Sequence, residues 1–239
     1  MHKNAFTPDN AAMVLIDHQV GTMSWTHSID INIVRKNTLK LAQIAKALEM
    51  PVVLTASMED QINFTGPLIP ELEQILPDAF AARIRRPGIV NAMHHEAFNK
   101  AVKATGRKKL FVAGITTEIC ITFPVLQMLE EGYEVQVAAD ASASFSQIGN
   151  DLALQRMHKA GAAIVTVPQI VSELALDWTS PNGKKLLSII DFVRPLVSER
   201  PLGCSTNLSL AIATTAFRRP ASQLRDRRND YEFDAFLVP

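Results

Sequence analysis

Cysteine is scarce in this 239-residue sequence, which has only Cys120 and Cys204. Two cysteines so far apart do not make the disulfide framework of a small secreted domain. No apolar signal core follows the first four residues, so we expect a reduced, cytoplasmic protein. Long hydrophobic runs are also lacking, and none approaches the roughly 18 residues that would span a bilayer. We therefore expect a soluble protein with no membrane partner.

An excess of positive charge is lacking too, because 24 Lys and Arg balance 24 Asp and Glu. This balance argues against a nucleic-acid partner, which would require a basic surface to neutralise phosphates. No glycine-rich phosphate loop follows a predicted strand, so we expect no nucleotide and no other cofactor. The histidines lack the spacing of a zinc site. We predict no metal and expect surface or loop positions for these residues: His18, His27, the pair His94 and His95, and His158.

The sequence does contain enough apolar residues, 47%, to bury a core without disulfides or metals. We expect one domain over residues 1–194. Charge and proline dominate the end of the chain, so residues 195–239 are predicted to form a peripheral or partly disordered tail.

Apolar runs alternate with helical patterns along the predicted domain. Residues 11–16 are continuously apolar, as in a strand that is buried on both faces, and Asp17 follows directly. A helical pattern over 31–50 stops at Pro51, before a strand at 52–55. The other predicted strands are 110–113, 135–139 and 163–167, and the other predicted helices are 71–76, 96–104, 119–131, 152–160 and 184–193. This alternation predicts an α/β fold with a three-layer, doubly wound, mostly parallel sheet and helices on both faces.

Ligands in such folds bind beyond the carboxyl ends of the strands. Asp17, Arg86 and Cys120 are all expected at such ends. Cys120 is placed near the start of a predicted helix, where main-chain N–H groups and the helix dipole would lower the pKa of its thiol. A small buried cysteine without a chemical role is the alternative.

The stretch Gly114-Ile115-Thr116-Thr117-Glu118-Ile119-Cys120 resembles the nucleophile loop of the isochorismatase-like superfamily, also called cysteine hydrolases. The resemblance extends to Asp17 within Leu15-Ile16-Asp17-His18-Gln19, and to Asp140-Ala141-Ser142. It covers roughly residues 8 to 178. These segments agree with the superfamily in both order and spacing.

The resemblance implies an isochorismatase-like, Rossmann-like fold and a catalytic triad of Asp17, Arg86 and Cys120. It also implies a cis peptide bond between Ile115 and Thr116, and an oxyanion hole made by the N–H groups of Thr116 and Cys120. The implied reaction is hydrolysis of a small amide or related C–N bond through an acyl-enzyme.

The third member of this triad departs from the commonest pattern, in which a Lys takes the place of Arg86. Arginine does not give up its proton readily, so Arg86 is expected to act electrostatically, and Arg85 is an adjacent candidate. Arg86, together with segments such as 66–72 and 101–106, resembles the YcaC-like branch. That branch implies a small-molecule substrate and a homo-oligomer, often an octamer.

Candidate substrate contacts lie on segments that are expected to overhang the strand ends: Gln19, Trp25, Phe64 and Phe123. Burial in the core is the alternative for these residues. Nicotinamidases of the superfamily carry an Asp and His metal cluster near the second strand, but residues 55–60 contain no His, which again predicts no metal.

Two other functions remain open at this point. One is isochorismatase-type cleavage of a vinyl ether, in which Asp17 would matter and the cysteine would be dispensable. The other is a non-catalytic, oligomeric binding or redox protein in which Cys120 is oxidised reversibly.

Overall fold

The computed structural model describes residues 5–190 as an α/β fold around one parallel sheet. The six strands lie in the order β3-β2-β1-β4-β5-β6, and all paired strands run parallel. Their bounds are β1 (Ala11–Ile16), β2 (Val52–Ser57), β3 (Ile84–Arg86), β4 (Lys109–Gly114), β5 (Glu134–Ala138) and β6 (Ala163–Val165). This topology confirms the predicted doubly wound fold.

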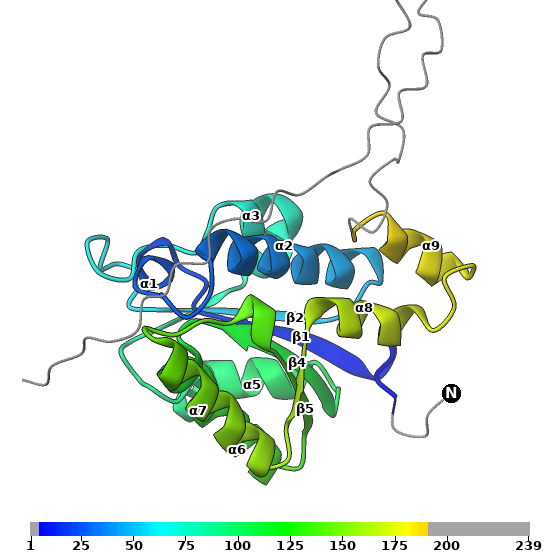
Figure 1. The fold of residues 1–239 in the computed structure, drawn as a ribbon. Helices are drawn as coiled ribbons and strands as arrows, with labels where there is room; N and C mark the ends of the chain where they lie inside the picture. Colours follow the sequence, from blue (N-terminus) through cyan, green and yellow to red (C-terminus); the bar gives the residue numbers. More distant parts are fainter. Residues whose placement is uncertain (1–4, 191–239) are drawn as a thin grey trace, which may run out of the picture. The chain divides into compact units, whose positions relative to one another are not determined.

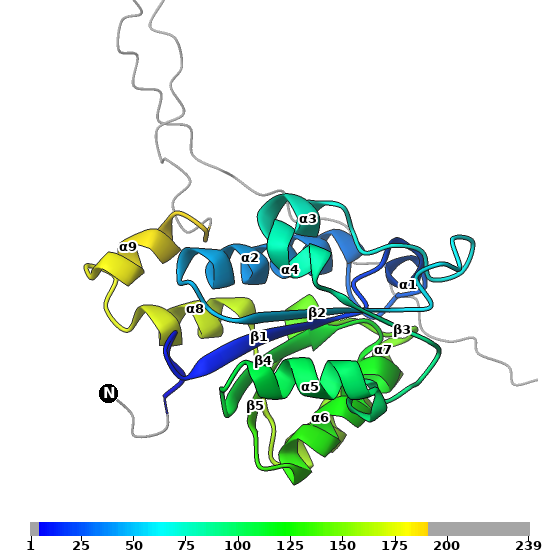
Figure 2. The ribbon, with the colours of Figure 1, turned by 180° about the vertical axis from the view of Figure 1, so that it is seen from behind.

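Helices cover both faces of the sheet, as Figures 1 and 2 show from opposite sides. One layer contains α2 (Ile31–Ala47), α3 (Glu71–Ile75), α4 (Pro77–Ala81), α8 (Val167–Ala175) and α9 (Pro181–Leu187). The other contains α5 (Glu96–Ala104), α6 (Thr122–Glu130) and α7 (Gln147–Lys159). The short helix α1 (Val20–Ser24) follows β1 at the end of the sheet where the strands finish. Within residues 5–190, no helix is long and apolar enough to cross a bilayer.

The side chains of β1 alternate between two hydrophobic cores. Met13 and Leu15 pack on the side of α2 and α8, whereas Val14 and Ile16 pack on the side of α5 and α6. All four side chains are at most 1% exposed. This two-sided burial explains why the strand is a continuous apolar run.

The chain runs from β1 outward to β2 and β3, and then crosses back to β4 on the other side of β1, so strand order reverses between β1 and β4. Ile16 is paired with Gly114 at the ends of these strands. A Cβ on Gly114 would lie 2.3 Å from the Ile16 carbonyl oxygen, so glycine permits this close approach. The residues that follow the two strands, including Asp17 and Cys120, therefore emerge side by side.

Several element boundaries differ from the predictions. The predicted strand 163–167 ends at Val165, and the unpredicted helix α8 begins at Val167, where Thr166 and Gln169 form a capping box. The predicted helix 184–193 begins earlier, as α9 at Pro181, because Ser180 caps that helix. Strand β3 and helix α4 were also not predicted.

Two helices are divided or shifted relative to their predicted bounds. The predicted helix 119–131 is a π-helical turn, η2 (Thr117–Ile121), followed by α6, and the predicted helix 152–160 begins earlier, at Gln147, because Ser146 caps it. Two short 3-10 turns, η1 (Ala92–His94) and η3 (Ala139–Ala141), complete the elements. The predicted tail, residues 195–239, lies outside the described residues.

Candidate active site

Asp17 is placed by the end of β1, where the chain leaves the sheet. Its N–H donates to the Thr55 carbonyl oxygen at 3.0 Å, which keeps it beside β2. Its φ is +56°, in the left-handed region that aspartate tolerates better than most residues. The side chain is fully buried, so the carboxylate requires internal partners.

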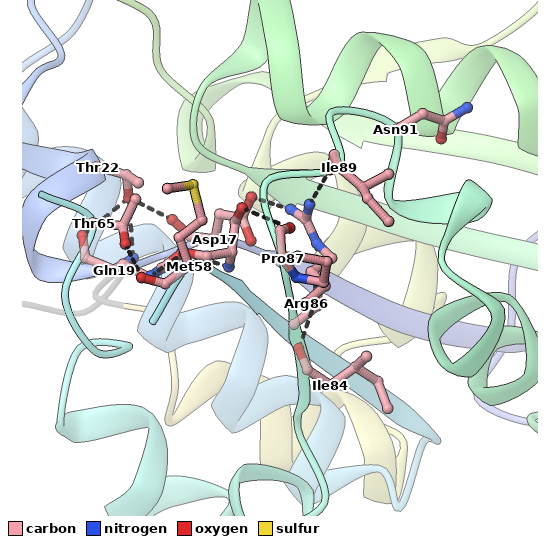
Figure 3. A network of polar contacts seen from close by, with 12 residues as sticks. Asp17, Gln19, Thr22, Met58, Thr65, Ile84, Arg86, Pro87, Ile89 and Asn91 are labelled. Atoms are coloured by element: carbon pink, nitrogen blue, oxygen red, sulfur yellow. Dashed lines mark hydrogen bonds and ion pairs between the residues drawn. The ribbon is translucent and has the colours of Figure 1, made fainter. Parts of the chain in front are cut away.

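Arg86, the last residue of β3, supplies the main partner of Asp17 (Figure 3). Its Nη2 donates to Oδ2 of Asp17 in a buried ion pair. Its Nε donates to the Thr55 hydroxyl at 3.1 Å, and its Nη1 donates to the Ile89 carbonyl oxygen at 2.6 Å. The three nitrogens thus hold three acceptors at once, which suits the planar guanidinium and not the single ammonium of lysine.

Cys120 lies in η2, just after β4, and is partly buried. Its thiol lies beside the Asp17 carboxylate, and each group affects the pKa of the other. Burial, and then the charge of Asp17, raise the pKa of Cys120 from 9.0 to about 12, although Arg86 and a hydrogen bond from the Thr116 backbone act in the opposite direction. The expectation of a lowered thiol pKa is therefore wrong, because desolvation and the nearby carboxylate outweigh the helical turn.

Burial also raises the pKa of the Asp17 carboxyl, against the opposing effects of Arg86 and the Cys120 thiol. A carboxylate whose pKa is raised accepts a proton more readily than one in water. The pair therefore consists of a protonated thiol beside a carboxylate that is poised to receive its proton.

The loop that carries Cys120 is anchored on both sides. Ile115 N–H donates to the Ile16 carbonyl oxygen at 3.1 Å, and Thr117 N–H donates to the Ala143 carbonyl oxygen at 2.9 Å. The peptide bond between Ile115 and Thr116 is cis, at the position where the superfamily resemblance implies one. These contacts hold the start of the Cys120 loop between the ends of β1 and β5.

A cavity of about 250 Å³ lies above these groups. Its lining is mostly apolar and includes Asp17, Arg86 and Cys120. The lining residues are Asp17, Thr22, Trp25, Ser57, Met58, Phe64, Thr65, Arg86, Gly88, Ile89, Val90, Ile115, Thr116, Ile119, Cys120 and Phe145. The structure thus brings together Asp17, Arg86, Cys120, Thr116, Ile115, Trp25 and Phe64 among the residues that were predicted for the site.

Three aromatic rings form one side of this cavity. Trp25 lies 4.8 Å from Phe64 in a tilted arrangement and 6.2 Å from Phe145 in a nearly parallel one. Phe64 and Phe145 are 51% and 42% exposed. Phe145 was missed by the sequence analysis, although its place three residues after Ser142 in the matched Asp140–Ser142 motif was a usable signal.

Two predicted substrate contacts do not line the cavity. Gln19 is buried, and its amide donates to the carbonyl oxygens of Ser57 and Gly66 at 3.0 and 2.5 Å, so it holds loops together. Phe123 faces away on α6, where its ring lies 5.4 Å from the Arg156 guanidinium. Both predictions relied on the expectation that these segments overhang the strand ends, which does not fix the direction of a side chain.

His18 and Arg85 also differ from expectation. His18 is fully buried rather than at a surface or in an exposed loop: its Nε2 contacts the Ala141 carbonyl oxygen at 3.0 Å, and burial lowers its pKa to about 4. Arg85 is 62% exposed and pairs with Glu59 at 3.1 Å, so Arg86 and not Arg85 reaches Asp17. In the described part of the chain, no three His, Cys, Asp or Glu residues are grouped as metal ligands.

Comparison with known proteins identifies the family to which this chain belongs. A family model described as the isochorismatase domain matches residues 11–169. The chain belongs to the isochorismatase family. A relative described as "Probable hydrolase YcaC", from Escherichia coli strain K12, is 43% identical over 170 residues, which cover 71% of this chain and 80% of that protein.

Solved structures agree with this membership and with the YcaC-like branch. The E. coli YcaC structure, described as an octameric hydrolase of unknown specificity, is 40% identical, has a TM-score of 0.73, and covers 79% of this chain and 92% of its own. YcaC from Pseudomonas aeruginosa, solved with hexane-2,5-diol and covalent acrylamide, is 38% identical and has the same TM-score. The match covers 79% of this chain and 93% of that one. The predicted family and branch are confirmed, and the chain stands among isochorismatase-family hydrolases.

Proposed function

We propose that this protein is a cysteine hydrolase that cleaves a small amide or related C–N bond through an acyl-enzyme. The observation that carries the proposal is that the Cys120 thiol and the Asp17 carboxylate interact and line the same cavity. A nucleophile, a base and a residue that orients the base are the parts that covalent catalysis needs. Arg86 is the orienting residue in this proposal.

The first half-reaction begins when Asp17 accepts the thiol proton as Cys120 sulfur attacks the carbonyl carbon. A C–S bond forms, and the carbonyl oxygen becomes an oxyanion. Collapse of the tetrahedral intermediate breaks the C–N bond, and the proton on Asp17 leaves with the amine. In the second half-reaction water attacks the thioester, Asp17 acts again as base, and the acid and free thiol are released.

The pKa values explain why a base is needed. With a pKa of about 12, Cys120 carries its proton near pH 7, so attack requires proton removal in the same step. The N–H groups of Thr116 and Cys120 are the proposed oxyanion hole, and Thr116 lines the cavity beside the thiol. Arg86 fixes the orientation of Asp17 and offsets its charge without taking part in proton transfer.

The relatives support two further parts of the proposal. Covalent acrylamide in P. aeruginosa YcaC is an amide-bearing electrophile, which is consistent with a reactive, amide-sized site in this branch. E. coli YcaC is described as octameric, and we propose that this chain likewise forms a homo-oligomer, as large as an octamer.

The deciding experiment compares wild type with Cys120→Ala and Cys120→Ser on a panel of small primary amides, with circular dichroism as the check on folding. We expect both variants to lose turnover while they keep the fold, and mass spectrometry of wild type to detect an acyl group on the peptide that contains Cys120. Full activity of Cys120→Ala would exclude the acyl-enzyme, and equal turnover of a vinyl ether by wild type and Cys120→Ala would favour vinyl ether cleavage. Reversible oxidation of Cys120 without turnover of any carbonyl compound would favour a redox protein.

A further inference from the structure

We infer that the site takes an uncharged substrate, a small amide with a flat, apolar acyl group, and that it rejects acyl groups that carry a carboxylate. This inference rests on the proposed function and adds a substrate class to it. It follows from three properties of the cavity: its charges, its aromatic wall and its size.

The charges of the cavity are already paired with each other. Among the lining residues that the structure describes, only Asp17 and Arg86 are ionic, and they form one ion pair. Each guanidinium nitrogen of Arg86 donates to a protein oxygen, and the side chain is 1% exposed. A substrate carboxylate would lie near the Asp17 carboxylate and would need to displace one of these acceptors, so its desolvation would go uncompensated.

The aromatic wall offers a flat apolar surface instead. Phe64, Trp25 and Phe145 follow one another along one side of the cavity. Phe64 and Phe145 are about half exposed, so their faces still have apolar area to bury against a ligand. Aromatic rings stack favourably on other flat groups. The rest of the lining includes aliphatic side chains, among them Ile89, Val90 and Ile119.

The size of the cavity limits the substrate to a small molecule. Its volume of about 250 Å³ is below the range of roughly 300–1,000 Å³ that holds drug-sized ligands. Benzamide meets all three requirements, because it is neutral, flat and small. Butyramide and succinamate form a matched test of charge, since a methyl group of the first is a carboxylate in the second.

The test measures alkylation of Cys120 by iodoacetamide and iodoacetate, which differ mainly in charge. Mass spectrometry follows the rate at Cys120, and glutathione gives the ratio of the two rates at a free thiol. We expect the ratio of iodoacetamide to iodoacetate at Cys120 to exceed the glutathione ratio by at least about tenfold. A ratio equal to that of glutathione would overturn the inference, whether or not any amide is hydrolysed.

A charge variant makes the same test sharper. Val90 lines the cavity and is 50% exposed, so Val90→Lys adds a cation at the rim without filling the core. We expect this variant to raise the rate at which iodoacetate alkylates Cys120 and to change the rate with iodoacetamide much less. Leu176 is 54% exposed at the end of α8 and does not line the cavity, so Leu176→Lys is the matched control and should leave the ratio of the two alkylation rates unchanged.

Rates of amide hydrolysis distinguish a failure of this inference from a failure of the proposed function. We expect kcat/KM to be highest for benzamide, lower for butyramide and at least about tenfold lower again for succinamate. Cleavage of succinamate as fast as butyramide, with loss of both activities in Cys120→Ala, would overturn the substrate class and leave the cysteine mechanism intact. Retention of both activities in Cys120→Ala would overturn the mechanism, while the alkylation ratio would still decide the charge preference.

Discussion

Arg86 and Asp17 form an ion pair in which the two side chains are 1% and 0% exposed. Each charge has been removed from water, so each depends on the other for compensation. The Thr55 hydroxyl and the Ile89 carbonyl oxygen hold the remaining guanidinium nitrogens. The pair is therefore a fixed support for the carboxylate that contacts Cys120.

Removal of the cation should destabilise the protein. We expect Arg86→Met to lower the free energy of unfolding by about 3–5 kcal/mol, because it leaves the Asp17 carboxylate buried without a partner. Urea unfolding at pH 7 measures this loss. The control is Arg35→Met, which breaks an ion pair with Glu71 whose side chains are 45% and 29% exposed, and it should change stability by less than about 1 kcal/mol. Equal effects of the two substitutions would contradict the role given to burial.

Substitutions of Asp17 and Arg86 should change the reactivity of Cys120 in opposite directions. The charge and hydrogen bond of Asp17 raise the pKa of Cys120, whereas the charge of Arg86 lowers it. Asp17→Asn should therefore speed alkylation by iodoacetamide at pH 8, by about threefold for each unit by which the pKa falls, and Arg86→Met should slow it.

Asp17→Asn should at the same time abolish amide turnover, because asparagine cannot accept the thiol proton. Faster alkylation without turnover distinguishes a base from a residue that merely maintains the fold. If both substitutions slowed alkylation equally, the electrostatic account of the thiol would be wrong.

The raised thiol pKa also predicts how stability depends on pH. Between pH 9.0 and about 12 the unfolded state loses the Cys120 proton and the folded state keeps it, so ionisation favours the unfolded state as pH rises. We expect the free energy of unfolding of wild type, minus that of Cys120→Ala, to fall by up to about 1.4 kcal/mol per pH unit in this window. Urea unfolding from pH 8 to 11 tests this, and Cys204 is present in both proteins. A constant difference would contradict the pKa.

The sequence was sufficient for the parts of the site that follow directly from strand ends. Asp17 and Cys120 each come after an apolar run, and parallel strands bring such ends together. The position of Arg86 followed from the superfamily resemblance, since the three-residue strand β3 is too short to be recognised by periodicity. Their roles in turnover remain predictions.

Other features depend on contacts that sequence patterns do not encode. Gln19 and Phe123 lie near motif residues in sequence, but one holds loops together and the other faces Arg156. The raised pKa of Cys120 arises from burial and from a carboxylate about a hundred positions away in sequence. The start of α8 was detectable, because Thr166 and Gln169 have the spacing of a capping box.

The approach of β1 and β4 should depend on Gly114. A Cβ there would lie 2.3 Å from the Ile16 carbonyl oxygen and 2.4 Å from the Ile121 side chain, so Gly114→Ala must push apart the strands that present Asp17 and Cys120. We expect a loss of about 1–3 kcal/mol in stability and a large loss of activity. Gly106→Ala, at φ +66° with no atom within 4 Å, should cost about 1–2 kcal/mol by strain alone and keep activity. Normal activity of Gly114→Ala would show that the spacing is not needed.

Thr55 offers the most selective test of how Arg86 is held. Its hydroxyl accepts from Arg86 Nε at 3.1 Å and donates to the Ile84 carbonyl oxygen at 2.8 Å, and the residue is fully buried. Thr55→Val keeps the shape but leaves both partners unsatisfied, which should cost about 1–3 kcal/mol. We also expect kcat to fall, because Arg86 would no longer orient Asp17, while Thr55→Ser should restore both properties.

The matched control for this last test is Thr38→Val. Thr38 is equally buried, but its hydroxyl donates only to the Val34 carbonyl oxygen within α2, at 2.9 Å. Its loss should reduce stability slightly and leave kcat unchanged, since no site residue depends on it. If kcat falls in Thr55→Val but not in Thr38→Val or Thr55→Ser, activity depends on the hydrogen bond from Arg86 to the Thr55 hydroxyl. If kcat is unchanged in both Thr55→Val and Thr38→Val, the remaining two contacts of Arg86 are sufficient.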